Sequence, residues 1–255
     1  MMANIHELIA KGAPLYGAWA TSNDPAVAEA MAGSGYDWLC LDSQHGPLDW
    51  HDLLPLLRAV GGTPTLVRTG WTDQMQIMRA LDMGASGVVV PMVSTVEQAK
   101  LAAEACFYPP RGNRSFGPIR NYYAADNRPD PLCLCMIETA EGAENIEKIA
   151  AVPGVGGLLI GPADLALALG EKLEFKISAQ ALKVIDRVIA ACEKNKKVSA
   201  MATLGPDNAK AMMERGIRMV ALGADMLHVR QGAAAELARA RAWKPAKKKT
   251  TGRRR

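Results

Sequence analysis

Short apolar runs alternate with longer amphipathic segments along most of the chain. Eight runs rich in Val, Ile and Leu occupy residues 15–20, 36–42, 64–69, 86–92, 132–138, 155–161, 198–203 and 217–223. Segments with helical periodicity follow them, such as DQMQIMRALDMG after the third run. Such alternation is typical of a parallel sheet, and the continuous apolar character predicts strands buried on both faces.

Eight strand-helix units can close as a barrel or lie open as a doubly wound sheet. An open dinucleotide-binding sheet carries a glycine-rich fingerprint after its first strand, and AWATSNDP at this place lacks it. The length of 255 residues is that of one α/β barrel. We therefore predict a single-domain (β/α)8 TIM barrel over residues 1–243 and a basic, disordered tail over residues 244–255.

Charge and cysteine usage narrow the class of protein. The net charge is +4, but seven of the cations lie in the last twelve residues, so no nucleic-acid-binding surface is expected on the folded part. The five cysteines form no Cys-x-x-Cys pair and lie mostly in apolar runs, which favours buried thiols in a reducing compartment. Neither a signal core nor an apolar stretch of about 18 residues is present. We expect a cytoplasmic enzyme without a membrane partner.

Polar residues end several of the apolar runs, at the face of a barrel where active sites lie. Asp42 ends the second run and His45 follows it, Arg68 lies at the end of the third, Glu138 ends the fifth, and Asp164 follows the sixth. Each residue alone also fits a helix cap, an ion pair or a loop histidine. Together, at four strand ends around one rim, they favour a catalytic site.

Glu138 and Asp164 offer two hard oxygen ligands from adjacent strands. This donor set suits Mg²⁺ or Mn²⁺, with Co²⁺ or Zn²⁺ as alternatives, and water and substrate oxygens would complete the coordination. A helix is predicted to begin near Ala163 and Asp164, where backbone N–H groups suit a substrate carboxylate. A 2-oxo acid would use both features, and the metal would stabilise its enolate as a Lewis acid.

The longest gap between runs, residues 107–131, is rich in Pro, Gly, Arg and Tyr. A regular helix over its whole length is excluded by this composition. Long irregular segments in compact domains are often functional. We therefore expect an active-site loop here.

The chain resembles the HpcH/HpaI family of class II, pyruvate-dependent aldolases over roughly residues 5–240. The ordered motifs LDSQHG, LVRTGWTDQMQIMRALDMGASGVVVPMV, FYPPRGNRSFGP, MIETAEGAENIEKI, GVGGLLIGPADLALALG and VALGAD carry the resemblance. It implies a metal-dependent aldolase that cleaves or forms 4-hydroxy-2-oxo acids, giving pyruvate and an aldehyde through a metal-bound pyruvate enolate. It also implies a homo-oligomer, usually a hexamer.

The same resemblance assigns roles to individual residues. It implies that Glu138 and Asp164 bind the metal and that Ala163 gives a backbone contact to the substrate carboxylate. Trp19 falls at the aromatic residue that follows the first strand, at the substrate. Met136 stands where many members have Gln, which alters how the oxo acid is held.

By resemblance, His45 is the general base, Asp82 raises its basicity, and Arg68 stabilises the developing enolate. Gln44 stands where many members have Glu. Asp82 ends the helix after the third strand, however, so one barrel would place it about 20 Å from His45, a barrel height at 3.3 Å per residue. We therefore expect a neighbouring subunit to donate Asp82, or its helix to end in an irregular excursion. The alternative is a purely structural partner for Asp82.

Three other functions compete with this interpretation. A Schiff-base aldolase needs a desolvated lysine near a strand's carboxyl end, but Lys196 and Lys197 precede the seventh run. A CoA-ester lyase of the same superfamily would share the metal and enolate chemistry and would be expected to carry a longer C-terminal elaboration. A non-catalytic oxo-acid-binding protein would be expected to have lost His45, Arg68 or a metal ligand. The sequence leaves open the aldehyde, the metal used in cells and the number of subunits.

Overall fold

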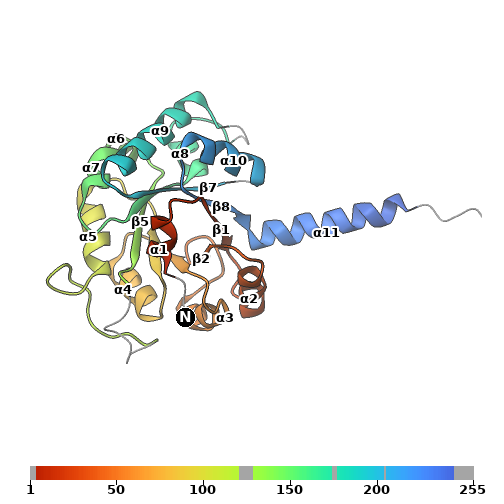
Figure 1. Ribbon diagram of the computed structural model, residues 1–255, viewed down its shortest axis with the longest axis horizontal. Helices are drawn as coiled ribbons and strands as arrows, with labels where there is room; N and C mark the ends of the chain where they lie inside the picture. The colour runs from red at the N-terminus through yellow and green to blue at the C-terminus, as the bar shows by residue number, and fades with distance from the viewer. Residues whose placement is uncertain (1–3, 121–128, 174–176, 204, 244–255) are drawn as a thin grey trace, which may run out of the picture.

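A closed barrel of eight parallel strands forms the centre of the molecule (Figure 1). The computed structural model describes residues 4–120, 129–173, 177–203 and 205–243. Each strand pairs with the next, and β8 pairs with β1. The strands are β1 (Leu15–Ala20), β2 (Trp38–Asp42), β3 (Thr65–Arg68), β4 (Gly87–Val90), β5 (Leu132–Ile137), β6 (Gly157–Ile160), β7 (Val198–Ala202) and β8 (Met219–Ala224). All eight predicted strands are confirmed, with ends that differ by at most two residues.

Helices follow the strands and surround the barrel. Capping residues in the sequence fix several of their starts: Asp49 and Thr95 each form a capping box with the residue three positions later, and Asp73 accepts from the backbone of Gln76. The helices are α1 (Ile5–Ala10), α2 (Pro25–Gly33), α3 (Trp50–Ala59), α4 (Gln74–Asp82), α5 (Val96–Cys106), α6 (Ala140–Glu144), α7 (Ile146–Ala151), α8 (Pro162–Ala168), α9 (Ala179–Lys194), α10 (Pro206–Arg215) and α11 (Asp225–Ala242).

Two apolar layers bury the strands on both faces. One fills the barrel and includes Trp38, Leu66 and Leu134, and the other lies between strands and helices and includes Leu41 and Ile137. All five cysteines are buried and unpaired, as the apolar runs predict. The continuous apolar strands of the sequence therefore reflect burial on both sides of the sheet.

Helix α1 closes the amino-terminal end of the barrel. Its Ile5 is buried, and Leu8 and Ile9 pack against the cluster inside the barrel. The interior is therefore filled with side chains from this side. The carboxyl ends of the strands remain as the face that holds a cavity.

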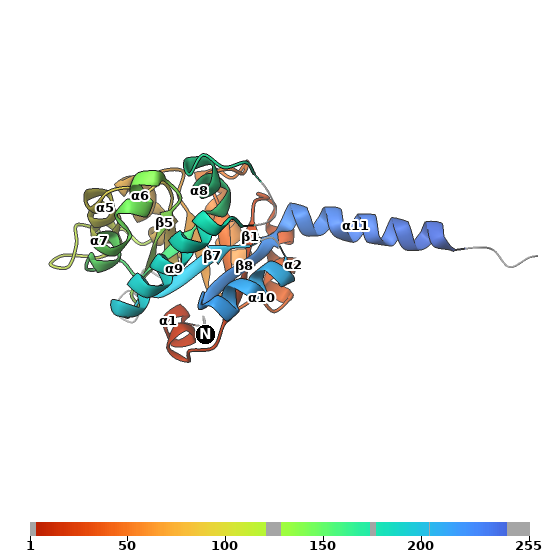
Figure 2. The same cartoon turned by 90° about the horizontal axis from the view of Figure 1, so that it is seen from above.

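The last helix leaves the body of the protein. Figures 1 and 2 show α11 projecting away from the barrel, and every residue from Val229 to Trp243 is exposed. Its first residue, Asp225, is by contrast buried. None of the described helices is both long enough and apolar enough to cross a membrane. The predicted tail over residues 244–255 lies outside the described residues.

Candidate active site

A cavity of about 650 Å³ opens at the carboxyl ends of the strands. Seven of the eight site residues predicted from the sequence line it, and they come from five different strand ends: Trp19, His45, Arg68, Met136, Glu138, Ala163 and Asp164. Asp82, the eighth, is not among the lining residues. Residues scattered over nearly 150 positions of sequence thus meet at one site because parallel strands end at one face of a barrel.

A buried ion pair joins the ends of β2 and β3. The Arg68 guanidinium donates from Nε to Asp42 Oδ1 at 2.8 Å and from Nη2 to Asp42 Oδ2 at 2.5 Å. Asp42 and Arg68 are opposite each other in the strand register. The planar guanidinium matches both carboxylate oxygens, which fixes its orientation. The carboxylate holds the pKa of Arg68 above its ordinary value, although burial opposes this effect.

The aromatic ring of Trp19 covers the same guanidinium. Arg68 Cζ lies 4.7 Å from the ring centre, and both residues are buried to about the same extent. A cation over an indole face is attracted by the ring's negative face. Trp19 therefore restrains Arg68 on one side while Asp42 restrains it on another.

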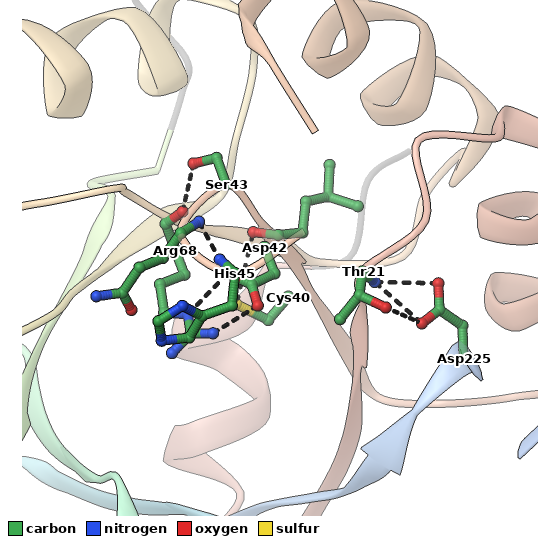
Figure 3. A network of polar contacts seen from close by, with 9 residues as sticks. Thr21, Cys40, Asp42, Ser43, His45, Arg68 and Asp225 are labelled. Atoms are coloured by element: carbon green, nitrogen blue, oxygen red, sulfur yellow. Dashed lines mark hydrogen bonds and ion pairs between the residues drawn. The ribbon is translucent and has the colours of Figure 1, made fainter. Parts of the chain in front are cut away.

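Asp42 and Arg68 also hold the turn that carries His45 (Figure 3). Asp42 Oδ1 accepts from the backbone of Gln44 at 3.0 Å and of His45 at 3.4 Å. The carbonyl oxygen of Arg68 accepts from the backbone of Ser43 at 3.1 Å and from its hydroxyl at 2.6 Å. The His45 side chain is exposed to the cavity and makes no hydrogen bond with the described residues.

Glu138 places a buried carboxylate at the end of β5. Its Oε1 accepts from the backbone of Met92 at 2.7 Å, whereas its Oε2 is buried with no hydrogen-bond partner among the described residues. Burial raises the pKa of Glu138, and the nearby Asp164 charge adds to the rise. A buried carboxylate oxygen without a donor is costly unless a ligand or ion satisfies it.

Gly161 makes room for this carboxylate. A Cβ at position 161 would lie 2.3 Å from Glu138 Oε2 and 3.0 Å from Met136 Cε. Only a residue without a side chain therefore leaves Glu138 and Met136 in place. Met136 is itself buried and lines the cavity.

Helix α8 begins beside Glu138. Gly161 is its N-cap and offers no side chain to the first turn, and Pro162 has no N–H to donate. The backbone N–H groups of Ala163 and Asp164 therefore have no capping acceptor. The side chain of Asp164 is exposed in the same turn and lines the cavity.

The donor set of Glu138 and Asp164 fits a hard divalent cation. Both are carboxylates, and the unpartnered Oε2 of Glu138 is the kind of atom that a cation satisfies. Within the described residues, no third His, Cys, Asp or Glu joins them in a metal-binding group. The remaining coordination positions would then belong to water and to substrate oxygens.

Asp82 contacts Arg114 and not His45, the partner that its expected role requires. Its Oδ1 accepts from Arg114 Nη2 at 2.7 Å, and its backbone carbonyl accepts from the backbone of Ile119 and Arg120. Arg114 also lies over the ring of Tyr108, at 4.7 Å from the ring centre. Within one chain, the structure brings Asp82 to the segment after α5 and not to His45.

Within a single chain, the described part of the expected active-site loop at residues 107–131 does not line the cavity. Residues 107–120 and 129–131 contribute no lining residue to the cavity. Instead, Asn113 and Arg114 bond through their backbone to the end of α5 and to Phe107. Residues 121–128 lie outside the described part of the chain.

Sequence reasoning also passed over three residues of the site. Asp42 was noted only as a strand end, yet it orients both Arg68 and the His45 turn. Thr21 lines the cavity but belongs to none of the motifs, and its hydroxyl donates to Asp225 at 2.6 Å. A signal existed for Asp42 and Asp225, because each is an acid at the end of a strand.

The two described lysines nearest in role to a Schiff-base nucleophile, Lys197 and Lys172, are poorly placed for covalent chemistry. Lys197, at the amino end of β7, donates to the carbonyl of Val152 at 2.6 Å, and burial lowers its pKa. It does not line the cavity. Lys172 does, but its side chain is exposed on the segment after α8. Neither is a desolvated amine at the carboxyl end of a strand, where the cavity lies.

A (β/α)8 barrel with an acid pair, a clamped arginine and a histidine at its carboxyl face defines the class of protein. The model of the HpcH/HpaI aldolase/citrate lyase family matches residues 15–232. The chain therefore belongs to the HpcH/HpaI aldolase/citrate lyase family, and it is an enzyme of the carbon–carbon lyase class.

Individual relatives agree with this assignment. A 4-hydroxy-2-oxovalerate aldolase of Novosphingobium aromaticivorans is 36% identical over 234 residues, which cover 85% of this chain and 86% of the relative. A hydroxypyruvate/pyruvate aldolase of Rhizorhabdus wittichii is 42% identical over 168 residues, covering 63% and 67%. A crystal structure of an HpcH/HpaI aldolase/citrate lyase family protein from Burkholderia cenocepacia superposes with a TM-score of 0.86 at 28% identity, covering 94% and 100%.

Proposed function

We propose that this protein is a divalent-metal-dependent aldolase that cleaves or forms 4-hydroxy-2-oxo acids, with pyruvate and an aldehyde as products of cleavage. One observation carries the proposal: a single cavity holds two carboxylates suited to a hard cation, a rigidly oriented guanidinium and an exposed histidine. The names of several relatives describe pyruvate or oxo-acid aldolases, which supports this reaction class.

Two groups bind the oxo acid in the proposed reaction. Glu138 and Asp164 would hold Mg²⁺ or Mn²⁺, or alternatively Co²⁺ or Zn²⁺; when bound, the ion supplies Lewis-acid stabilisation of negative charge on the substrate oxygens. The backbone N–H groups of Ala163 and Asp164 bind the substrate carboxylate, because nothing in Gly161 competes for them. Trp19 and Met136 form the apolar walls beside the oxo acid.

Carbon–carbon cleavage needs a base and a stabilised enolate. His45, directly or through a water molecule, removes the proton of the C4 hydroxyl group. The C4–O bond becomes a carbonyl and the C3–C4 bond breaks. Its electron pair forms the C2=C3 double bond while the π pair of the C2 carbonyl moves onto oxygen, which gives the enolate of pyruvate. Arg68 stabilises the charge on the enolate oxygen, since Asp42 and Trp19 hold it in one orientation before the reaction. Protonation at C3 by water then yields pyruvate, and transfer of the proton from His45 to solvent restores the base.

Assembly with copies of the same chain is part of the proposal. Helix α11 projects from the barrel and exposes Met226, Val229, Leu237 and Trp243, which fits a helix that packs on a second subunit. The family resemblance favours six subunits. The five buried, unpaired thiols support a cytoplasmic location.

Pyruvate release from a panel of 4-hydroxy-2-oxo acids, measured with Mg²⁺ or Mn²⁺, tests the function. We expect turnover of at least one substrate, loss of activity in chelator, and recovery when the divalent ion is returned. Borohydride with pyruvate should trap no covalent adduct, although Lys172 lines the cavity. Full activity in chelator, or a trapped lysine adduct, would refute the metal-dependent mechanism. Turnover of a CoA ester instead of these acids would favour the CoA-ester lyase, and no turnover of either would favour a binding protein.

A further inference from the structure

Asp225 buries its carboxylate between β8 and the turn that follows β1. The residue is only 2% exposed. It accepts from the backbone of Thr21 at 3.0 and 3.1 Å and from the Thr21 hydroxyl at 2.6 Å (Figure 3). It also accepts from the backbone of Ser22 at 2.8 Å. The backbone of Met226 is a fourth donor, at 2.8 Å. All four donors are neutral.

The hydrogen bonds of Asp225 do more than hold β1 and β8 together, because the two strands already pair through their backbones. Burial of a carboxylate surrounded by neutral donors is costly unless its oxygens are fully satisfied, and here three of the four donors lie on one turn. The specific result is a fixed orientation for Thr21 and Ser22.

An irregularity in β8 aims Asp225 at this turn. The register between β1 and β8 shifts: Gly17 pairs with Ala221, whereas Trp19 pairs with Ala224, so β8 holds one extra residue. Gly223 lies within that stretch with φ of +127°, a conformation that favours glycine. Bulges commonly redirect side chains beside active sites.

The turn fixed by Asp225 lies directly against the His45 turn. A Cβ at Gly46 would lie 2.5 Å from the carbonyl oxygen of Thr21, so the two backbones are in close contact. Gly46 follows His45 in sequence. A shift of Thr21 therefore pushes on the turn that carries the proposed base.

The same turn also reaches the proposed enolate stabiliser. Trp19 lies two residues before Thr21 and covers Arg68 at 4.7 Å. Both paths from the Asp225 carboxylate, through Gly46 and through Trp19, thus end at groups that act on the substrate in the proposed reaction.

We propose that Asp225 is a positioning residue, which holds the Thr21–Ser22 turn so that His45 and Arg68 keep their places at the cavity. Its effect on turnover rests on the proposed function. Its effect on the geometry of His45 does not. The two are therefore measured separately.

The first measurement is steady-state kinetics of Asp225→Asn, which keeps the shape of the side chain but turns one acceptor into a donor that faces N–H groups. We expect kcat to fall by about 10-fold to 100-fold, because small misplacements of reacting groups have effects of this size. KM for the oxo acid should change by less than about threefold, since the metal and carboxylate contacts are retained. The control is Asp37→Asn: Asp37 accepts from the backbone of Tyr16 at 2.8 Å at the other end of β1, and kcat should stay near wild type.

The second measurement needs no activity. The chain has four histidines, so the ring signals of labelled histidine are few, and the His45 signal is identified by its loss in His45→Gln. We expect the His45 signal to move in Asp225→Asn and in Gly46→Ala, and to stay in place in Asp37→Asn. Thr21→Val removes a single donor to Asp225 and should give a smaller shift in the same direction, which preserves the test should Asp225→Asn fail to fold.

An unmoved His45 signal in both Asp225→Asn and Thr21→Val would overturn the proposal. A thermal-stability loss with unchanged kcat per folded molecule would do the same, since it would make Asp225 purely structural. If the His45 signal moves as expected but wild type turns over no oxo acid, the proposed function fails while the positioning of His45 by Asp225 stands.

Discussion

Asp42 and Arg68 face each other across the ends of β2 and β3 and share two hydrogen bonds, of 2.8 and 2.5 Å, in an almost fully buried place. The same carboxylate oxygen that orients Arg68 Nε also accepts from the backbone of the His45 turn. One side chain therefore sets the position of both the proposed base and the proposed enolate stabiliser.

Removal of Asp42 should cost stability as well as activity. Asp42→Ala leaves the Arg68 charge buried without its partner, so we expect the free energy of unfolding to fall by about 3–5 kcal/mol. Asp186→Ala is a matched control, because Asp186 pairs with Arg215 through the same two-bond geometry at a half-exposed surface site and should cost less than about 1 kcal/mol. Urea unfolding of both variants checks the difference. Equal losses would mean that the buried pair is no more important to the fold than the surface pair.

The guanidinium shape at position 68 should matter beyond its charge. Arg68→Lys keeps a cation at this position. An ammonium group cannot donate to both oxygens of Asp42 and to an enolate oxygen at the same time, so we expect kcat to fall by about 100-fold. Exchange of the pyruvate methyl protons with solvent should fall in parallel, because exchange passes through the same enolate. Normal exchange in this variant would remove Arg68 from the enolate side of the reaction.

The missing side chain at position 161 should control cation affinity. In Gly161→Ala, the added methyl group would lie 2.3 Å from Glu138 Oε2, so the carboxylate must move. We expect Mn²⁺ affinity, measured by calorimetry without substrate, to fall by at least about 10-fold, the size seen when ligand orientation is disturbed. Gly33→Ala on α2 meets no neighbouring atom within 4 Å and serves as the control. Unchanged Mn²⁺ affinity in Gly161→Ala would remove Glu138 from the metal site.

Burial of Cys192 should make the protein less stable at alkaline pH. Burial raises the pKa of this thiol to about 11 in the folded state, whereas the unfolded thiol ionises near its ordinary pKa of about 9. As the pH rises, the unfolded state therefore loses the Cys192 proton before the folded state does. The contribution of this thiol to the free energy of unfolding is complete below pH 9 and is lost as the pH rises to 11. Between those values we expect wild type to lose about 2 kcal/mol more than Cys192→Ala. Identical pH profiles of unfolding would contradict the raised pKa.

Asp82 provides the test of a site shared between subunits. Within one chain it bonds to Arg114, which is consistent either with a structural role or with a surface that a neighbour's His45 approaches. Inactive His45→Ala and Asp82→Ala proteins, mixed and allowed to exchange subunits, should regain part of the activity if the pair crosses an interface, because some sites then hold both intact residues. Verified exchange without recovery would leave Asp82 with Arg114 as its partner.

Much of this architecture follows from local patterns in the sequence. The eight apolar runs match the strands because burial on both faces removes polar alternation, as in residues 132–138 and β5. The strand ends also led to His45, Arg68, Glu138 and Asp164, since a barrel brings its carboxyl ends to one face. These predictions need only the period of the pattern and the topology.

The same sequence patterns do not predict contacts between side chains of distant segments. Nothing in the spacing of Thr21 and Asp225 shows that a register shift in β8 brings them to 2.6 Å. The segment after α5 looked like an active-site loop because of its composition, yet its described part packs beside α4 and α5. Composition indicates that a segment is irregular, but the partners of its backbone groups depend on packing.

If a second copy of the chain packs on helix α11, as proposed, the behaviour of this enzyme should depend on its concentration. The fifteen residues from Val229 to Trp243 are exposed on a single chain, and a helix of this length without tertiary contacts is only marginally stable in water. If a second copy covers α11, dilution favours the separated chains by mass action, and part of the helical signal is lost with them. Because Asp225 is the first residue of that helix, fraying that reaches its first turn would loosen the hold on Thr21. Specific activity measured at low and high enzyme concentration would then differ, although no residue of the cavity had changed.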